Sequence, residues 1–228
     1  MDDDDHAAAW RRIGAAEGGV TLAAVAQACA GDLDVDCLGV SLVVTGELRF
    51  MGYATDERAR RMEDAQLITG EGPCTDAYVQ RVLIEEADLH RAFSRWPAYT
   101  QAAADQQLRS VTALPLATGH LRIGAVDLYR AAPGLLSDRH KSRAGAYARI
   151  IALLALDEHP HLLTAGRRPV RSGPQGYPPS VHLAAGVLAE MYQSPPEDAL
   201  ARMRAHAFSH AQPLHQTADQ VLNHHTLE

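Results

Sequence analysis

The chain lacks any apolar run long enough to span a membrane. A spanning helix needs about 20 consecutive apolar residues, and no segment of the 228-residue sequence approaches that length. The first residues, MDDDDHAAAW, are acidic, whereas a secretory signal opens with a basic segment followed by an apolar core. These absences predict a protein without a membrane partner, and we expect it to be cytoplasmic.

Cysteine is scarce, and acidic residues outnumber basic ones. The three cysteines, Cys29, Cys37 and Cys74, are odd in number and not closely spaced, which argues against a disulfide framework or a zinc knuckle. Lysine and arginine total 21 against 28 aspartates and glutamates, a net charge of -7. A protein that binds nucleic acid through a broad electrostatic field is basic. Any nucleic-acid contact must therefore depend on local geometry.

Common enzyme motifs are also absent. The sequence contains no nucleophile elbow, no Walker loop and no dinucleotide-binding fingerprint. The glycines of GHLRIG fall in an expected hairpin and do not open a helix, so a phosphate-binding loop is excluded there. We expect no enzymatic activity and no cofactor.

The sequence from 1 to 157 mixes helical and strand patterns. Apolar residues recur at helical spacing in 7–30, with Gly31 as the expected helix end. Two pairs of strand-like segments, CLGVSLVV with LRFMGYAT and RSVTALPLA with LRIGAVDLYRA, are each joined by a short turn. Helical patterns lie between the hairpins, and a long one follows Ser137, a predicted N-cap. This order predicts an α+β domain, an antiparallel sheet flanked by helices.

The remaining sequence predicts a linker and a small all-α domain. Residues 158–177 are rich in Gly, Pro and Arg without periodicity, and 178–228 contain three amphipathic helical patterns without a strand signal. The middle helix has a strong start signal, with Ser194 as N-cap, Pro195 at the first position and Glu197 at the third. Three short helices bury little apolar surface. We therefore expect them to lean on the first domain, a partner chain or a ligand.

Two stretches resemble known families. GEGPCTDAY and the segment RWPAYTQAAADQQLRSVTALPLATGHLRIGAVDLYRAAPGLLSD are similar to GAF domains of the actinobacterial type, over roughly 15–157. VHLAAGVLAEMYQSPPEDALARMRAHAFSHAQPLHQTADQVL resembles an ANTAR domain, over roughly 178–224. The order matches the GAF–ANTAR regulators of transcription antitermination. The second resemblance is the more specific, since its small-residue step, capped turn and Met203–Arg204 pair keep the family's order and spacing.

The resemblance implies two activities. GAF domains sense small molecules in a cavity between the sheet and its covering helices, and they often dimerise through terminal helices. ANTAR domains bind nascent RNA that carries paired hairpins, generally as dimers, and so prevent a terminator from forming. We therefore expect a homodimer with a hairpin-containing leader RNA as partner and a small-molecule ligand in the first domain.

Candidate RNA contacts lie on the first two C-terminal helices. Ala185 and Gly186 are expected to leave a bare patch that a phosphate or base can approach. Arg204 is the expected main cation, because its position matches the family's Leu-Arg step. Arg202 points about 200° away from Arg204 around a helix, so the two do not share a face. The remaining candidates are the donors His182, His206 and Ser209.

The acidic charge of residues 177–228 and the presence of Ala185 favour an alternative function. Many ANTAR domains carry a basic or hydroxyl residue where this chain has Ala185. Residues 177–228 hold two arginines, no lysine and five acidic residues. In this alternative Arg204 is a solvated surface arginine, Ala185 and Gly186 serve close helix packing, and the helices are a dimerisation or protein-interaction module of a small-molecule sensor that binds no RNA.

Three residues of the first domain are candidates for ligand binding. Trp96 and Tyr99 are expected to line the GAF cavity or to form core, and Asp127, within an apolar strand, to line the cavity or to bond turn backbone. Cys74 follows a glycine break at an expected helix N-terminus, where a thiolate is favoured. A small buried hydrophobe is the alternative, and a GAF-type methionine sulfoxide reductase would need a second cysteine beside Cys74.

A metal site is not predicted. His206 and His210 are four residues apart on one helix, a spacing that metals accept. No third ligand is evident in the sequence, and the Glu of metalloprotease helices is missing between them.

Overall fold

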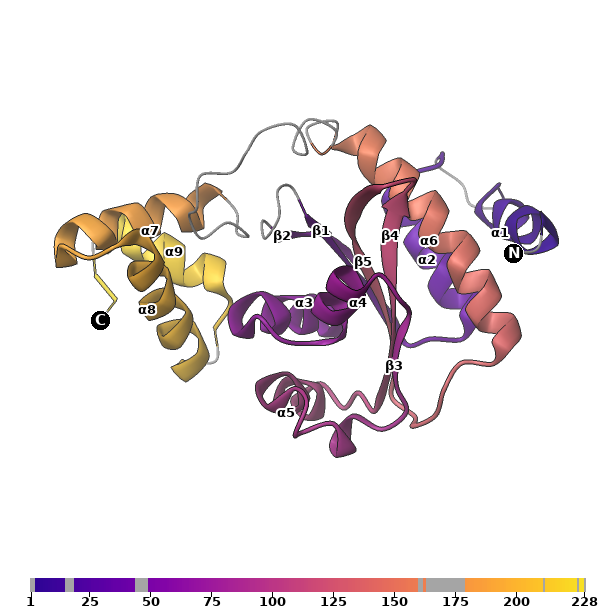
Figure 1. Cartoon of the computed structure of the whole chain (residues 1–228), viewed down its shortest axis with the longest axis horizontal. Helices are drawn as coiled ribbons and strands as arrows, with labels where there is room; N and C mark the ends of the chain where they lie inside the picture. Colours follow the sequence, from indigo (N-terminus) through magenta and orange to yellow (C-terminus); the bar gives the residue numbers. More distant parts are fainter. Residues whose placement is uncertain are drawn as a thin grey trace.

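The computed structural model describes residues 3–14, 19–43, 49–159, 162, 179–210, 212–224 and 226–227. Within them the chain forms a sheet covered by helices, followed by three C-terminal helices (Figure 1). No helix of this part of the chain is long and apolar enough to cross a membrane.

The strands of the described residues pair into one antiparallel sheet. β1 (Cys37–Val43) and β2 (Arg49–Ala54) form one hairpin, and β4 (Ser110–Thr118) and β5 (Leu121–Arg130) form the second. The short β3 (Ile84–Glu86) pairs with β4, and β1 pairs with β5. The order across the sheet is therefore β2-β1-β5-β4-β3, and both predicted hairpins are confirmed.

Two helices cover one face of this sheet, α2 (Leu22–Leu33) and α6 (Asp138–Glu158), and α1 (Asp3–Gly14) packs against these two helices (Figure 1). Side chains alternate between the two faces along a strand, so Val40 of β1 and Val126 of β5 point into the core beneath these helices. The core is apolar, and its burial holds α2 and α6 to the sheet.

The opposite face carries α3 (Glu57–Thr69), α4 (Pro73–Gln80), α5 (Pro97–Asp105) and the short 3-10 turn η1 (Leu89–Arg91). The alternate strand positions point this way, including Tyr129 of β5. Helices on both faces of an antiparallel sheet confirm the predicted α+β class.

The C-terminal part consists of α7 (Pro179–Tyr192), α8 (Pro196–Ser209) and α9 (Leu214–His224). These helices pack around an apolar core of their own, and Ile68 of α3 packs against it. Figure 1 shows them beside α3, on the far side of the molecule from α1 and α6. Of the three alternatives that the sequence left open, a contact with the first domain is the one seen here.

The predicted start of α8 is wrong by one residue. Pro195 occupies the N-cap and Pro196 the first helical position, and no side chain caps the helix. Proline suits the first position because its missing N–H has no partner there. Ser194 therefore lies outside the helix, although the Ser-Pro sequence placed the boundary nearly correctly.

Of two other predicted helix boundaries, the start of α6 is confirmed and the end of α2 is wrong. Ser137 caps α6 as predicted, accepting a hydrogen bond from the His140 N–H at 3.1 Å. α2 instead runs past Gly31, and Asp34 ends it in the left-handed conformation at φ 53°. Most of the predicted linker, 158–177, lies outside the described residues, and its first residue, Glu158, still belongs to α6.

A substitution at Gly124 tests how closely the backbones of β1 and β5 approach each other. A Cβ at this position would overlap the backbone of β1 at Ser41. We expect Gly124→Ala to lower the free energy of unfolding by about 2 kcal/mol or more, because backbone cannot rotate away as a side chain can. Urea denaturation measures this change.

Gly31→Ala is the matched control for that substitution. Gly31 lies within α2, and an added Cβ meets nothing within 4 Å. Alanine favours a helix over glycine by up to about 1 kcal/mol, so this variant should be neutral or more stable. Equal losses in the two variants would contradict the assigned β1–β5 contact.

Candidate functional site

A buried polar cluster lies between α3 and the sheet. Glu63 and Gln66 are one helical turn apart on α3 and point the same way, and both are buried. The register of the sheet places Gly39 of β1 opposite Asp127 of β5. A Cβ at Gly39 would overlap the Glu63 carboxyl group. The glycine therefore leaves the space that the Glu63 side chain occupies. Asp127 is also completely buried.

Hydrogen bonds join these groups across three elements. The Ser41 hydroxyl donates to Glu63 Oε2 at 2.5 Å, and Gln66 Nε2 donates to Asp127 Oδ2 at 2.6 Å. The Tyr129 hydroxyl lies 3.0 Å from Glu63 Oε1 and 3.0 Å from Asp127 Oδ2. A hydroxyl has one proton to donate. Both contacts are satisfied when Glu63 is protonated and donates to Tyr129, which in turn donates to Asp127.

The electrostatics agree with a protonated Glu63. Burial and, next, the negative charge of Asp127 raise the pKa of Glu63 to about 8, against the hydrogen bonds with Ser41 and Tyr129, which act in the opposite direction. Asp64 adds a smaller contribution that also raises it. Among the described residues, no basic side chain contributes to this shift. Burial likewise raises the pKa of the Tyr99 and Tyr129 hydroxyls.

Cys74 borders the cluster from α4. It is the second residue of that helix, and its N–H donates to Gln66 Oε1 at 2.9 Å. One ligand atom from each of Glu63, Cys74 and Asp127 can be chosen so that all three lie within 4.8 Å of one another, and all three side chains are buried. These are the residues that could hold a metal ion in the part of the chain that the structure describes.

The other two cysteines lie in different surroundings. Cys29 packs under α6 in the core on the opposite face of the sheet. Burial raises the pKa of Cys29, and it raises the pKa of Cys37 to about 12 with Asp56 adding to the rise. None of the three cysteines forms a disulfide in the part of the chain that the structure describes. A reductase dithiol therefore has no preformed disulfide here.

The predicted ligand contacts of the first domain separate into two groups. Asp127 belongs to the cluster, and the completely buried Tyr99 lies near it. Trp96 meets the Tyr99 ring edge-on at 5.9 Å, but its indole N–H donates to Asp76 at 3.3 Å. The Arg95 guanidinium lies 4.3 Å from the centre of the Trp96 ring. Trp96 thus packs in the core at the start of α5 and does not act mainly as a cavity wall.

Glu63 and Gln66 were not predicted from the sequence. A signal was present, since Ala59, Met62, Glu63 and Gln66 are the buried positions of α3 and keep helical spacing. Only two of these four buried positions, Ala59 and Met62, are apolar. An acidic residue in such a row is solvated in most helices, so the pattern alone did not mark it.

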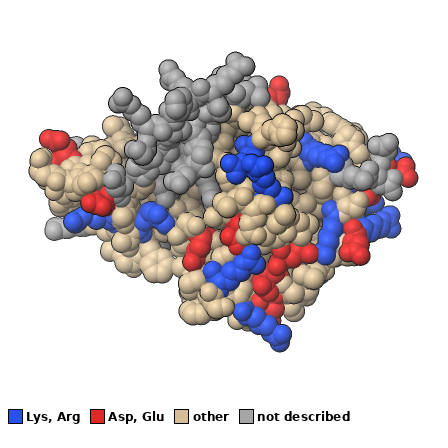
Figure 2. Space-filling view, in the orientation of Figure 1, with Lys and Arg blue, Asp and Glu red and all other residues tan. Residues whose placement is uncertain are grey.

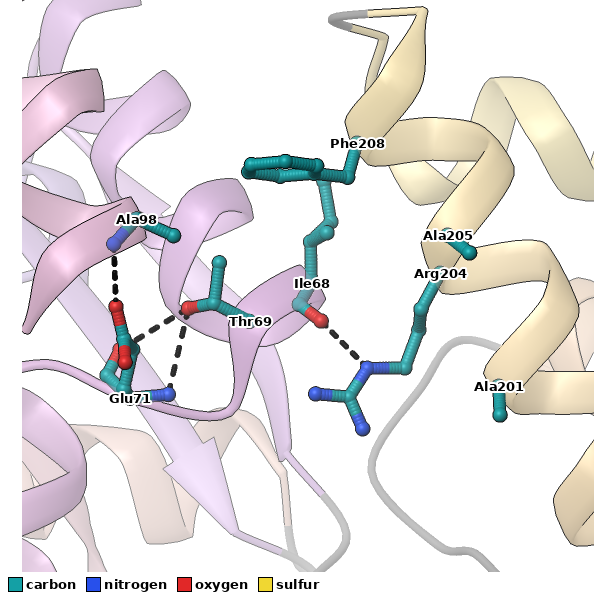
Figure 3. Close-up of a pocket in the computed structure, with 8 residues that line it drawn as sticks. All are labelled: Ile68, Thr69, Glu71, Ala98, Ala201, Arg204, Ala205 and Phe208. Carbon is teal, nitrogen blue, oxygen red and sulfur yellow. Dashed lines mark hydrogen bonds between the residues drawn. The ribbon is translucent and has the colours of Figure 1, made fainter.

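A second feature is the contact between α8 and the end of α3. The Arg204 side chain is partly buried, and its Nε donates to the Ile68 carbonyl oxygen (Figure 3). The carbonyls of the last helical turn lack intrahelical donors, so the guanidinium satisfies one of them. A pocket of about 370 Å³ lies beside this contact. Its lining residues are Ile68, Thr69, Glu71, Ala98, Ala201, Arg204, Ala205 and Phe208.

The predicted bare patch on α7 is wrong for one of its two residues. Ala185 is only 3% exposed and packs in the core of the C-terminal helices, which is the close-packing role that the sequence left open. Gly186 is exposed, and an added Cβ there would meet nothing within 4 Å. His182 is partly buried on the same helix.

The other predicted RNA contacts lie on α8. Arg202 is exposed, with its guanidinium 5.1 Å from the centre of the Tyr192 ring. The rings of His206 and His210 stack at 4.0 Å, and partial burial lowers the pKa of His206 with His210 adding to the effect. The Ser209 hydroxyl donates to the His206 carbonyl at 3.0 Å. As expected, Arg202 and Arg204 do not share a face.

Surface charge is mixed on the face of the molecule in Figure 2. Lysine and arginine side chains are interspersed with aspartate and glutamate and form no single broad basic area in this view. This agrees with the net charge of -7. A polyanion would have to be held by a few directed contacts on this face.

Comparisons with known proteins found similar structures only. Neither the family models nor the curated proteins include a match to this chain. The GAF domain of a phosphoenolpyruvate-protein phosphotransferase from Acinetobacter is 11% identical, with a TM-score of 0.49 over 70% of this chain and 97% of that one. A GAF domain/HD domain protein from Geobacter sulfurreducens is 13% identical, with a TM-score of 0.45 over 63% and 98%.

A third similar structure is an enzyme. The type II free methionine-R-sulfoxide reductase from Thermoplasma acidophilum is 14% identical, with a TM-score of 0.44 over 60% of this chain and 90% of that chain.

The protonation of Glu63 predicts a pH-dependent stability. The folded protein holds this proton up to about pH 8, whereas the ordinary pKa of a glutamate is 4.5. Between these values the unfolded chain binds fewer protons than the folded one, so stability falls as the pH rises. We expect the melting temperature, measured with a chelator present, to fall across this range.

Glu63→Gln is the control for this dependence. The amide keeps the shape of the protonated carboxyl and carries no titrating proton. The variant should lose the part of the slope between pH 4.5 and about 8 that Glu63 supplies. Parallel melting curves for wild type and variant would contradict a protonated Glu63.

Proposed function

We propose that the chain is a signal-responsive regulator of transcription antitermination. A GAF-type domain receives the signal, and ANTAR-type C-terminal helices bind nascent RNA with paired hairpins. The protein acts in the cytoplasm, as a homodimer and without catalysis. Support comes from the resemblance of the two sequence segments and from the contact between the two parts of the chain.

The observation that carries the proposal is the hydrogen bond between Arg204 and the Ile68 carbonyl. Arg204 is the cation that the ANTAR resemblance assigns to RNA. Ile68 lies near the end of α3, and the same helix carries Glu63 of the buried cluster. One helix therefore contacts both the site suited to a signal and the residue suited to RNA.

This arrangement supports a population shift between two states. In the docked state Arg204 bonds to α3 and is withheld from RNA. In the undocked state the guanidinium is free to meet a phosphate or a base edge. A signal that binds one state more tightly changes the ratio of the two. Because both parts are joined through α3, a small displacement of that helix at the cluster alters the docking contact.

A second function is favoured by the burial of Ala185. With this residue 3% exposed, only Gly186 remains of the patch expected to approach RNA. The C-terminal helices then serve dimerisation or a protein partner, and the chain is a small-molecule sensor without RNA binding. The two functions differ in whether a polyanion binds and in how binding responds to salt.

RNA binding is tested with a pool of dual-hairpin RNAs in a mobility-shift assay. We expect saturable binding that weakens steeply as salt rises, because phosphate contacts release counterions. Arg204→Ala should weaken binding about 10-fold, the loss of one charge-assisted contact of roughly 1.5 kcal/mol. Far-ultraviolet circular dichroism confirms that the variant is folded.

The control is an arginine remote from the C-terminal helices. Arg149 is exposed on α6, so Arg149→Ala removes the same charge without touching α8. It should leave RNA affinity unchanged. Absence of saturable binding by wild type at low salt would exclude the antitermination function and leave the sensor.

Undocking is tested with Ile68→Glu. Ile68 is partly buried against the core of α7 to α9, and a charge there disfavours docking. We expect the apparent RNA affinity to rise several-fold, since it scales with the fraction of competent molecules. Small-angle X-ray scattering should show a larger radius of gyration.

Leu153→Glu serves as the comparison for Ile68→Glu. Leu153 is 53% exposed on α6, so the same change there should alter neither RNA affinity nor size. If Ile68→Glu expands the molecule but leaves RNA affinity unchanged, docking does not control binding.

A further inference from the structure

We propose that Glu63, Cys74 and Asp127 form a binding site for a first-row divalent transition-metal ion such as Zn²⁺ or Fe²⁺. This inference concerns the first domain alone. It goes beyond the regulatory function and stands whether or not the C-terminal helices bind RNA.

The geometry brings three ligands from three elements to one point. Glu63 comes from α3, Cys74 from α4 and Asp127 from β5, and their chosen ligand atoms lie within 4.8 Å of one another. Zinc binds oxygen at about 2.0–2.2 Å and sulfur at about 2.3 Å in a tetrahedral arrangement, so two ligand atoms of one ion lie roughly 3.5 Å apart. A small inward movement of the side chains would complete the coordination.

Charge balance favours a cation at this position. Two carboxyl groups and a thiol are buried together, and a metal ion would bind them with release of the Glu63 and Cys74 protons. The donors to the carboxyl groups include the neutral groups of Ser41, Gln66 and Tyr129. Buried charges in proteins are generally paired or coordinate a metal. A divalent ion would place a positive charge among these buried groups.

Tyr99 provides an independent indication of a ligand. Its hydroxyl is completely buried and makes no hydrogen bond of good geometry, and its candidate partner is the Tyr129 hydroxyl. Asp127, Glu63 and Cys74 act on it electrostatically. Buried hydroxyls are rarely left without a partner. An ion, or a water bound to it, would give this hydroxyl one.

The donor set selects the class of metal. A thiolate suits zinc and iron and disfavours magnesium and calcium, which prefer oxygen ligands only. The hydrogen bonds from Ser41 and Gln66 hold one oxygen of each carboxylate. Such outer contacts orient ligands around a metal. Gly39 leaves the space that Glu63 needs to reach this position.

Metal binding is tested on the full chain after removal of metals with a chelator. Zn²⁺ is titrated by calorimetry, and Fe²⁺ is titrated in a separate arm under anaerobic conditions. We expect one high-affinity ion per chain and a rise in melting temperature on binding, because the folded state alone forms the site. The arm with the tighter binding identifies the preferred ion.

Co²⁺ reports the ligands directly. A thiolate bound to cobalt gives a charge-transfer absorption in the near ultraviolet, which should appear in wild type and be lost in Cys74→Ser. Loss of an outer-shell partner costs about 10–100-fold in affinity, so loss of a ligand in Asp127→Asn or Cys74→Ser should cost about 100-fold or more. The melting transition of each metal-free variant shows whether it folds.

Two controls separate this site from adventitious binding. Cys29→Ser removes a buried thiol on the other face of the sheet, and His206→Ala removes half of the stacked pair on α8. Both should keep the cobalt absorption and the affinity. Absence of one-to-one binding in wild type, or equal affinity in wild type and a folded Asp127→Asn, would overturn the proposal.

Discussion

The burial of two carboxyl groups beneath α3 constrains the rest of the first domain. Glu63 and Asp127 lie in a layer that is mostly apolar, and a buried polar group without a partner is costly. The contacts that satisfy them include groups from three elements, with Ser41 on β1, Tyr129 on β5 and Gln66 on α3. The helix can therefore sit over the sheet in few positions. An apolar interface would tolerate a slide of α3, whereas this network specifies its register.

The same helix links the cluster to the C-terminal helices. Its middle turns face the sheet, and its last turn presents Ile68 both as an apolar contact and as a carbonyl acceptor. Coupling between sites needs an element with two arrangements that both sites bias. α3 is suited to that role because its middle turns and its last turn are held by different kinds of contact, a buried polar network and a small docking surface. The docking surface is the weaker of the two, since it involves few side chains.

The C-terminal helices show why a small all-α unit uses its neighbour. Three short helices enclose a narrow core, in which Ala185 and Ala184 are completely or nearly buried. Small side chains let the helices approach, but they bury little area. Docking adds Ile68 to this core and gives Arg204 an acceptor. The arginine that the resemblance assigns to RNA thus already has a partner within the chain. In the proposed function, RNA would have to compete with α3 for this guanidinium.

The sequence by itself determined the α+β class, both hairpins, the Ser137 cap and three helices after 178, because these follow from periodicity and local start and stop signals. It also placed Asp127 within an apolar strand, where a buried carboxylate is unusual. Only the tertiary structure decided that Asp127 meets Glu63, a residue 64 positions away in the chain, that Ala185 turns inward and that Arg204 bonds to Ile68. Local patterns record which face of an element is apolar. Which polar side chains meet depends on how the elements are packed, and that is set by contacts between residues far apart in the sequence.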